Sequence, residues 1–260
     1  MPFTTVAHIQ SIDPAGVYTA INAALGEQHI RSTTTQIFVP ELNQIVALAA
    51  GVEIAVESFA RVVAPSLRTL SRFEIEPFSS AAAAAVTPAA PHPIYDMRDT
   101  PLPLVKDEVY TAEINSNPVA AQIQWVVTWF ADGPIVPVGG KMFSVRFTGT
   151  TALVASTWVN VPITLSEDLP RGRYQVVGLR VRSAGVVAGR MVFVGGRWRP
   201  GVLGNPTQQG VHAPIFSFGD MGVFGEFEDT DLPSVDFLST SADAAEDGNI
   251  DLIQLRSGPG

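Results

Sequence analysis

From residue 105 to residue 256 the chain is a succession of short apolar segments separated by turn residues. Val, Ile, Phe, Tyr and Trp are frequent in these segments, and such residues favour β-strands. Gly, Pro, Asn and Asp interrupt them too often to leave room for crossover helices. The pattern predicts an all-β fold, an antiparallel sandwich that forms a single jelly roll of about eight strands. The predicted strands are 105–114, 121–130, 142–148, 152–161, 174–182, 186–194, 215–218, 235–238 and 250–256.

Residues 1–64 read as an N-terminal arm with a short helix and a strand. Asp13 and Pro14 form an N-cap and first-turn pair, and Val17, Ile21 and Leu25 follow at a spacing of four, which predicts a helix over 14–25. The remaining segments are less regular. We expect strands at 33–40 and 45–50, a helix at 52–63, and a strand at 67–78.

Residues 79–103 form an Ala/Pro-rich strap that begins with an alanine run. Five prolines between 88 and 103 keep the rest of the strap extended. Composition does not change across it, so we interpret it as a long connection inside one β domain, 65–256, with a short tail at 257–260.

The surface of this chain is short of charge. Charged residues are 16% of the 260 residues and apolar residues are 46%, whereas soluble domains carry roughly 25% charged residues. There are fourteen arginines but two lysines, Lys106 and Lys141. Arg suits buried planar contacts and Lys is the usual solvated charge. The composition favours a subunit whose surface is partly covered by other copies of itself.

Several function classes are disfavoured. The net charge is −9, and affinity for nucleic acid depends on Lys and Arg, so direct nucleic-acid binding is not expected. The absence of cysteine excludes disulfides, thiolate metal sites and thiol catalysis. The first thirteen residues lack a signal-peptide layout, and no apolar run reaches the ~18 residues of a transmembrane segment.

No enzymatic site emerges from the motifs. The histidines, His8, His29, His92 and His212, are not at metal-ligand spacing. We therefore assign no catalytic, cofactor-binding or metal residues. Glu226 and Glu228 are a conceivable glycosidase pair, but two acids on a solvated strand face are commoner.

A calcium-like motif and the tryptophans also have ordinary structural interpretations. Asp247-Gly-Asn249-Ile-Asp251 opens like a calcium loop but lacks the later glycine and glutamate, so an ordinary turn into the last strand is the preferred interpretation. Trp125 and Trp129 read as core residues. Trp198, between two arginines, is the best candidate for an exposed aromatic ring.

Residues 169–201 contain seven arginines and no acid, whereas residues 220–251 contain ten acids and no Lys or Arg. Such segregation is what ion pairs between subunits, or across the sheets of one subunit, require. Strict alternation in 174–182 predicts one face with Tyr174, Val176, Gly178, Arg180 and Arg182. The candidate subunit-interface residues are Arg180, Arg182, Arg190, Trp198, Glu226 and Glu228.

Two runs carry a family resemblance. DLPRGRYQVVGLRVRSAGVVAGRMVFVGGRWRPGV and FGDMGVFGEFEDTDLPSVDFLST resemble the later strands of jelly-roll coat proteins of small icosahedral viruses, of bacteriophage type. The shared features are the Leu-Pro-x-Gly-x-Tyr entry into a hairpin, the Arg-Pro-Gly exit, and a long loop before a glycine-rich strand. The resemblance covers about 105–256.

This resemblance implies a structural coat protein that self-assembles into an icosahedral capsid, is located in the virion, and contacts minor capsid proteins. One departure is that residues 1–30 contain no Lys or Arg, so we do not expect direct genome packaging; the inner face would meet a membrane or another protein. The alternative is a β-sandwich carbohydrate-binding module that uses Trp198 and nearby loop aromatics. A cupin-like or glycosidase-like enzyme ranks third.

Overall fold

The computed structural model describes residues 3–52, 58–69, 73–75, 78–79, 94–116, 120–204, 213–243 and 245–257. The chain divides into two compact units. Unit 1 consists of Met1–Thr5 and Pro134–Gly260, and unit 2 consists of Val6–Gly133. This division does not coincide with the boundary between residues 64 and 65 expected from the sequence.

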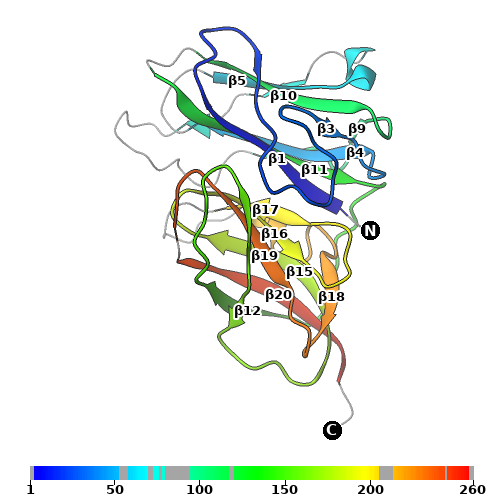
Figure 1. Ribbon diagram of the computed structural model, residues 1–260. Coiled ribbons are helices and arrows are strands. Elements are labelled where there is room, and N and C mark those ends of the chain that lie inside the picture. The colour runs from blue at the N-terminus through cyan, green and yellow to red at the C-terminus, as the bar shows by residue number, and fades with distance from the viewer. Residues whose placement is uncertain are drawn as a thin grey trace. The chain divides into compact units, whose positions relative to one another are not determined.

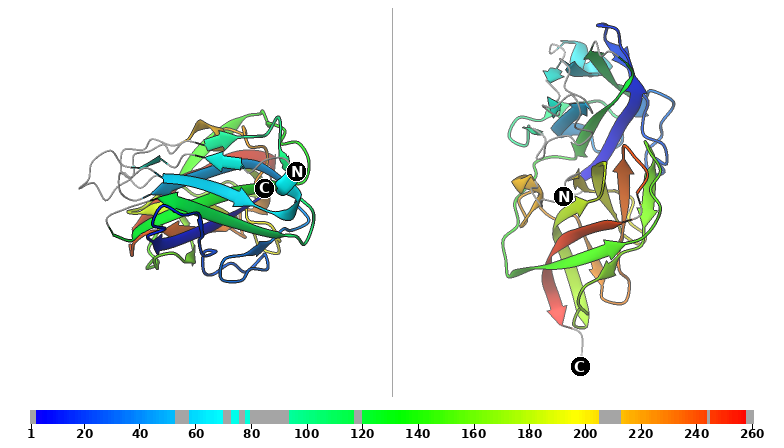
Figure 2. Two further views of the ribbon diagram at one scale, coloured as in Figure 1. Left: turned by 90° about the horizontal axis from the view of Figure 1, so that it is seen from above. Right: turned by 90° about the vertical axis from the view of Figure 1, so that its left-hand side faces the viewer.

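Unit 1 contains two antiparallel sheets (Figure 1). The five-stranded sheet has the order β14-β12-β20-β15-β18, and the four-stranded sheet has the order β13-β19-β16-β17. Some neighbours in these sheets are distant in sequence, since the last strand, β20, lies between β12 and β15 (Figure 2). The strands are β12 (Met142–Gly149), β13 (Trp158–Val161), β14 (Thr164–Leu165), β15 (Gly172–Arg182), β16 (Val186–Val192), β17 (Gly201–Leu203), β18 (Gly225–Glu228), β19 (Ser234–Ser239) and β20 (Glu246–Ser257).

Unit 2 also has two sheets. One has the order β1-β11-β4-β7, with β8 and β9 also paired to β4, and the other has the order β2-β10-β5-β6, with β3 paired to β10. The strands are β1 (Phe3–Ile12), whose first three residues belong to unit 1, β2 (Thr19–Ala20), β3 (Ile37–Phe38), β4 (Gln44–Val52), β5 (Ser58–Val63), β6 (Phe73–Ile75), β7 (Phe78–Ser79), β8 (Ile94–Asp96), β9 (Leu102–Pro103), β10 (Val109–Ser116) and β11 (Gln122–Ala131).

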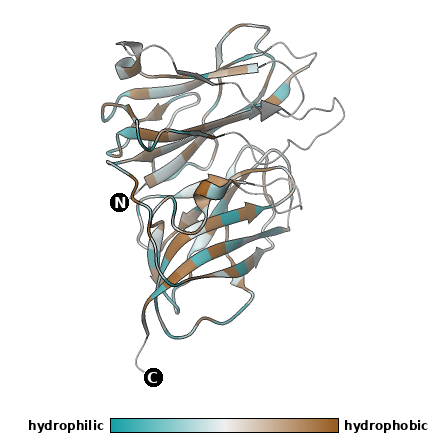
Figure 3. Ribbon diagram, turned by 180° about the vertical axis from the view of Figure 1, so that it is seen from behind, coloured by the Kyte–Doolittle hydropathy of each residue, from teal (hydrophilic) through white to brown (hydrophobic). Residues whose placement is uncertain are grey.

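Each unit buries its own apolar core. In unit 2, Tyr110, Trp125, Trp129 and Phe130 are fully buried, which agrees with the core role predicted for the two tryptophans. In unit 1, the strands present apolar and polar residues in turn, a pattern of sheets with one buried face. Figure 3 shows this alternation as brown and teal bands along these strands.

The all-β class predicted from the sequence is confirmed, but the helix expected over 14–25 is wrong. The side chain of Asp13 accepts a hydrogen bond from the Ala15 amide at 2.9 Å, in a turn where Ala15 has φ 51°. Thr19–Ala20 then pairs with β10 as strand β2. A turn closed by an aspartate competes with helix capping, and pairing in the sheet overrides the apolar spacing.

The expected helix over 52–63 is also contradicted where the structure describes it, because Ser58–Val63 is strand β5 with alternating burial; residues 53–57 lie outside the described residues. The segment expected as strand 215–218 contains a 3-10 turn, Pro214–Phe216. The expected turn at 247–251 is instead part of β20. In β5 and β20, pairing in a sheet outweighs local propensity. At 214–216 the difference is the opposite one, because apolar residues expected in a strand form a turn.

Other elements are nearer to expectation. The strand expected at 45–50 is confirmed within β4. Strand 33–40 is shortened to β3, and 67–78 is divided into a 3-10 turn, Pro65–Thr69, and the short strands β6 and β7. In the strap, β8 and β9 pair with β4, and residues 80–93 lie outside the described residues. Among the helices of the described parts, none is long and apolar enough to cross a membrane.

Candidate assembly surface

The arginine-rich segment 169–201 includes β15, β16 and the loop after β16. Three of its seven arginines, Arg173, Arg180 and Arg182, lie on β15 in the five-stranded sheet of unit 1. The register shifts between Val176, which pairs with Leu252, and Gly178, which pairs with Asp251, so Val177 is an extra residue. A bulge of this kind reverses the phase of alternation. Tyr174 and Val176 are therefore buried on the core side, whereas Arg180 and Arg182 lie on the opposite, outer face.

The predicted face of alternating residues is thus divided by the bulge. Gly178 remains with the two arginines on the outer face, where a side chain in its place would meet the Asp251 carboxylate. Glycine at this position leaves room for an acidic side chain on the neighbouring strand β20. The outer face is polar as a result.

Arg180 and Asp251 form the central ion pair of this face. The Arg180 Nη2 atom lies 2.5 Å from Oδ1 of Asp251, and Nη1 lies 3.1 Å from Oδ2. The hydroxyl of Ser144 donates to the same carboxylate, and the backbone amide of Phe218 donates to Oδ2 at 3.0 Å. Asp251 has no exposed surface, so the pair is largely desolvated and its hydrogen bonds are the strong, charge-assisted kind.

A second pair lies one step along the same strands. Arg182 contacts Asp247 through two hydrogen bonds of 2.6 Å, and Arg146 approaches the same carboxylate at 3.2 Å. Burial by itself raises the pKa of Asp247, but the hydrogen bond and charge of Arg182, with the charge of Arg146, bring it below its ordinary value. The hydrogen bond to Asp247 correspondingly raises the pKa of Arg182.

Glu226 and Glu228 lie at the far edge of the same face, on β18. Glu226 pairs with Arg173 at 2.5 Å and accepts a hydrogen bond from Gln175. Both acids are exposed, and exposed ion pairs contribute about 0–1 kcal/mol. The expected same-side arrangement of these two residues is observed, and Glu226 is held by an arginine.

The described side chains of this outer face balance in charge. Four arginines and four carboxylates lie in paired or neighbouring positions on it: Arg146, Arg173, Arg180 and Arg182 with Glu226, Glu228, Asp247 and Asp251. The whole chain has a net charge of −9. The negative charge is therefore concentrated elsewhere on the chain.

Arg190 is separate from this surface, because it belongs to β16 in the other sheet of unit 1. It is 1% exposed, its Nε lies 2.9 Å from Oδ2 of Asp236, and its guanidinium lies 4.0 Å from the ring centre of Trp158. It also donates to the carbonyl of Thr5 at 3.3 Å. These contacts are all inside the chain.

Trp198 lies in the loop between β16 and β17 and is half-buried. The guanidinium of Arg197 lies 4.4 Å from the centre of its ring, so that part of the ring is already engaged by a cation–π contact. The side chain of Arg199 donates to the carbonyl of Gly196 at 2.8 Å. The structure thus brings Arg180, Arg182, Glu226 and Glu228 together on one sheet face and places Arg190 and Trp198 elsewhere.

Glu246, at the start of β20, is a buried acid that the sequence analysis did not single out. It is 1% exposed, and neither carboxylate oxygen makes a well-formed hydrogen bond among the described residues, although the backbone of Glu246 itself and of Thr151 lies close to it. It lies opposite Gly149 in the register of β12. Burial raises the pKa of Glu246 and outweighs the lowering effect of the nearby backbone groups of Glu246 and Thr151, and the charge of Asp243 adds to the rise.

We expect Glu246→Gln to stabilise the protein at neutral pH, by on the order of 1 kcal/mol, because an ionised buried carboxyl costs more than a buried amide. Above the ordinary glutamate pKa the unfolded chain has lost a proton that folded Glu246 still holds. The stabilising contribution of Glu246 is therefore full below that pKa and is lost as pH rises through the raised folded pKa. Urea unfolding from pH 4 to 8 measures this: the difference between variant and wild type should grow with pH. The exposed Glu228→Gln is the control, and a difference independent of pH would contradict the assignment.

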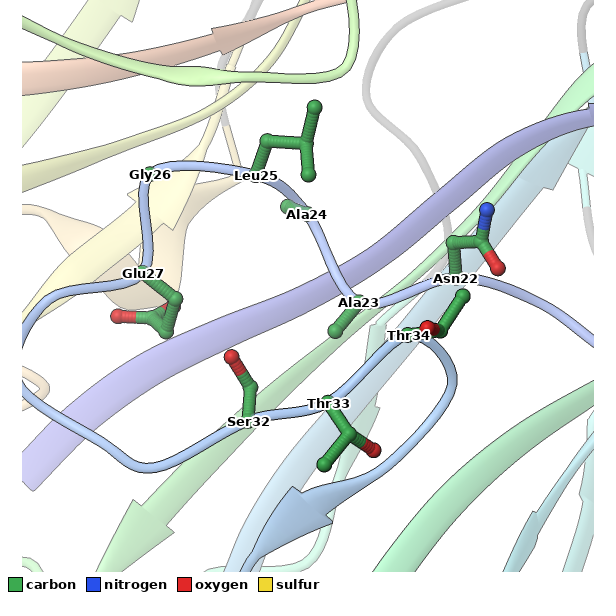
Figure 4. A pocket seen from close by; sticks show the side chains of 9 residues that line it. All are labelled: Asn22, Ala23, Ala24, Leu25, Gly26, Glu27, Ser32, Thr33 and Thr34. Carbon is green, nitrogen blue, oxygen red and sulfur yellow. The ribbon is translucent and has the colours of Figure 1, made fainter.

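Unit 2 contains a hollow of about 330 Å³. Figure 4 shows the chain segments Asn22–Glu27 and Ser32–Thr34 along its opposite sides. Beside it, Glu27 and His29 form a buried pair with 2.6 Å between Oε1 and Nδ1. His8 on β1 pairs with Ala23, one of the lining residues, through a backbone bridge, and burial lowers the pKa of its imidazole to about 4. None of the described residues that line the hollow is aromatic, so these residues offer no stacking platform of the kind expected of a sugar site.

Within the described residues there is no group of three or more His, Cys, Asp or Glu side chains arranged to hold a metal ion. The Asp247–Asn249–Asp251 motif is instead engaged by arginines, through Arg182, Arg146 and Arg180. Sequence reasoning missed Phe218 and Ser144, the partners that complete the Arg180–Asp251 cluster. The approach of β12, β15 and β20 brings them together, and no local motif signals it.

Comparisons with protein-family models, with curated proteins and with solved structures give no match to this chain.

Proposed function

We propose that this chain is a non-enzymatic structural subunit that assembles with copies of itself into a closed shell, as a viral coat protein does. We further propose that each of its two units is a jelly roll. The arrangement of strands supports the second statement, and the distribution of charge supports the first.

The support from strand order is clearest in unit 1. Numbered along the chain, its eight main strands are β12, β13, β15, β16, β17, β18, β19 and β20. In these numbers the two sheets have the orders 1-8-3-6 and 2-7-4-5. Strand 1 pairs with 8, 2 with 7, 3 with 6 and 4 with 5, all antiparallel. A long hairpin of four strand pairs, rolled into two sheets, gives these orders, and this is the arrangement of a jelly roll.

Unit 2 supports the same reading. With β1, β2, β4, β5, β6, β8, β10 and β11 numbered in order, its sheets are again 1-8-3-6 and 2-7-4-5. We therefore propose two consecutive jelly rolls, in place of the single roll and N-terminal arm expected from the sequence. Jelly rolls occur in viral capsid proteins, lectins and cupins, so the fold alone does not choose a function.

The observation that carries self-assembly is the outer sheet face of unit 1. On a chain of net charge −9 it balances four arginines against four carboxylates. Copies of an acidic protein repel one another through most surfaces, and a face of balanced charge removes that repulsion locally. The chain has only two lysines in 260 residues. Because the lysine ammonium group is strongly hydrated, a surface with few lysines is easier to bury in a contact between subunits.

Purified full-length protein should form large, closed particles. Size-exclusion chromatography with light scattering gives the mass, and negative-stain microscopy shows the shape. A stable 27.7 kDa monomer over a wide range of salt, pH and protein concentration would overturn the proposal. Reduced assembly at low ionic strength, with recovery when salt screens the acidic surfaces, is the expected dependence.

The second candidate remains a carbohydrate-binding module. It is favoured by the half-buried ring of Trp198 beside Arg197 on a loop of unit 1. A glycan array tests it: binding that disappears in Trp198→Ala, while the variant unfolds at the wild-type temperature, would establish this function. Absence of binding would leave the ring as a packing element of the loop.

A further inference from the structure

We propose that the outer face of the five-stranded sheet of unit 1, around Phe218, binds a second copy of this chain. This inference rests on the proposed function, since it names the surface through which the copies meet. We call the surface the Phe218 patch, and it comprises Phe218, Val136, Met142, Ile253 and Arg180.

Phe218 has an unusual conformation and exposure. Its backbone φ is 54°, in the left-handed region, and the residue is 63% exposed. A bulky residue with positive φ costs free energy that the surrounding structure must supply. An aromatic ring left in water gains nothing from burial within the chain. Two unfavourable features at one residue indicate a function other than stability.

The strained backbone of Phe218 is held firmly. Its amide donates to the buried carboxylate of Asp251 at 3.0 Å, and the next amide, of Gly219, donates to the carbonyl of Val177 at 2.6 Å. Arg180 donates to the hydroxyl of Ser217 at 3.0 Å while bonded to the same Asp251. The ring is therefore presented on a rigid support, which lowers the entropy lost on binding.

Apolar residues lie around this support. The amide of Val138 donates to the carbonyl of Gly219 at 2.8 Å, which brings the segment before β12 alongside the Phe218 loop. Val136 in that segment is 64% exposed. Gly219 lies against Met142, and Gly140 lies against Ile253, and both side chains are half-buried. The patch thus joins an aromatic ring, aliphatic groups and an arginine, the composition of protein–protein contact centres.

Charge identifies the occupant as a second copy. The four arginines and four carboxylates named above on the sheet face beside the patch sum to zero, on a chain of −9. A nucleic acid would need a positive surface, and a basic partner would be attracted to the acidic remainder of the chain. A neutral, partly apolar face suits an identical face related by two-fold symmetry. In such a contact, the Arg180 guanidinium, 5.2 Å from its own Phe218 ring, can also meet the ring of the partner.

Phe218→Gly separates binding from folding. Glycine accepts the left-handed conformation without strain, so the variant should unfold at the wild-type temperature or above it. The same variant removes the aromatic anchor, and we expect association weakened at least tenfold, measured by sedimentation velocity over a concentration series. Phe218→Asn, which also tolerates positive φ, is the second variant, and Leu25→Ser, at an equally exposed position in unit 2, is the matched control.

The outcomes distinguish this inference from the proposed function. If wild type forms shells and both Phe218 variants form them equally well, the Phe218 patch is not the contact, although shell assembly stands. If wild type forms Phe218-dependent dimers but no shells, the patch is supported and the shell is not. If wild type remains monomeric at all concentrations, both are overturned.

Discussion

Replacing Asp251 with asparagine should lower the free energy of unfolding by about 3–5 kcal/mol, the usual cost of removing one member of a buried ion pair. The Asp251 carboxylate is fully buried and receives Arg180, Ser144 and the Phe218 amide. An amide at this position presents N–H groups to some of these donors and leaves Arg180 without its counter-charge. Urea denaturation followed by circular dichroism measures the change.

The matched control is Asp247→Asn on the same strand. Asp247 is partly exposed and pairs with Arg182 and Arg146. Solvent screening limits the contribution of such a pair to the free energy of unfolding to about 1 kcal/mol or less. Equal losses for the two variants would mean that burial does not distinguish the two pairs. If Asp251→Asn lowers the free energy of unfolding by less than 1 kcal/mol, the Asp251 ion pair is not the rigid support of Phe218 that we infer.

The opposite signs of the two charged segments were predictable, and the particular partners were not. Seven arginines followed by ten acids indicate pairing, and the structure pairs Arg173, Arg180, Arg182 and Arg190 with downstream carboxylates. The extra residue Val177 decides which arginines face outward. A bulge arises from pairing with two neighbouring strands, so a single strand sequence does not reveal it.

The second pair of sheets, in unit 2, was hidden for a related reason. In β4, residues after the first are buried on both faces, which removes the alternation that identifies a strand. β2 and β3 contain two residues each, too few for any periodic pattern. Residues 1–64 were therefore predicted to be an arm with helices. In the structure, their strands pair with β10 and β11, which follow the strap in the chain.

The conformation that makes Phe218 a candidate could not be read from the sequence either. Gly219 and Gly222, which also have positive φ, signal a turn, and glycine is the residue expected there. The left-handed residue before them is a phenylalanine whose amide is fixed by a carboxylate 33 positions later. Long-range contacts of this kind decide the site, whereas composition indicates only that the chain has surface to cover.

Arg190→Met should cost about 3–5 kcal/mol of unfolding free energy, because it leaves a desolvated carboxylate without its cation. Arg190 is 1% exposed, and Asp236 keeps an amide hydrogen bond from Asn160 at 2.8 Å but loses its charge partner. The variant also removes the cation–π contact with Trp158. Thermal and urea unfolding should both report the loss.

The double variant Arg190→Met with Asp236→Leu tests the cause. If the unpaired charge is what destabilises the single variant, replacing both partners with apolar side chains should recover most of the loss, because two desolvation penalties disappear together. Arg146→Met is the control: its side chain is 58% exposed, and Asp247 retains Arg182, so a change under about 1 kcal/mol is expected. A double variant as unstable as the single one would show that the shape of Arg190 in the packing around Trp158 and Thr5 matters more than its charge.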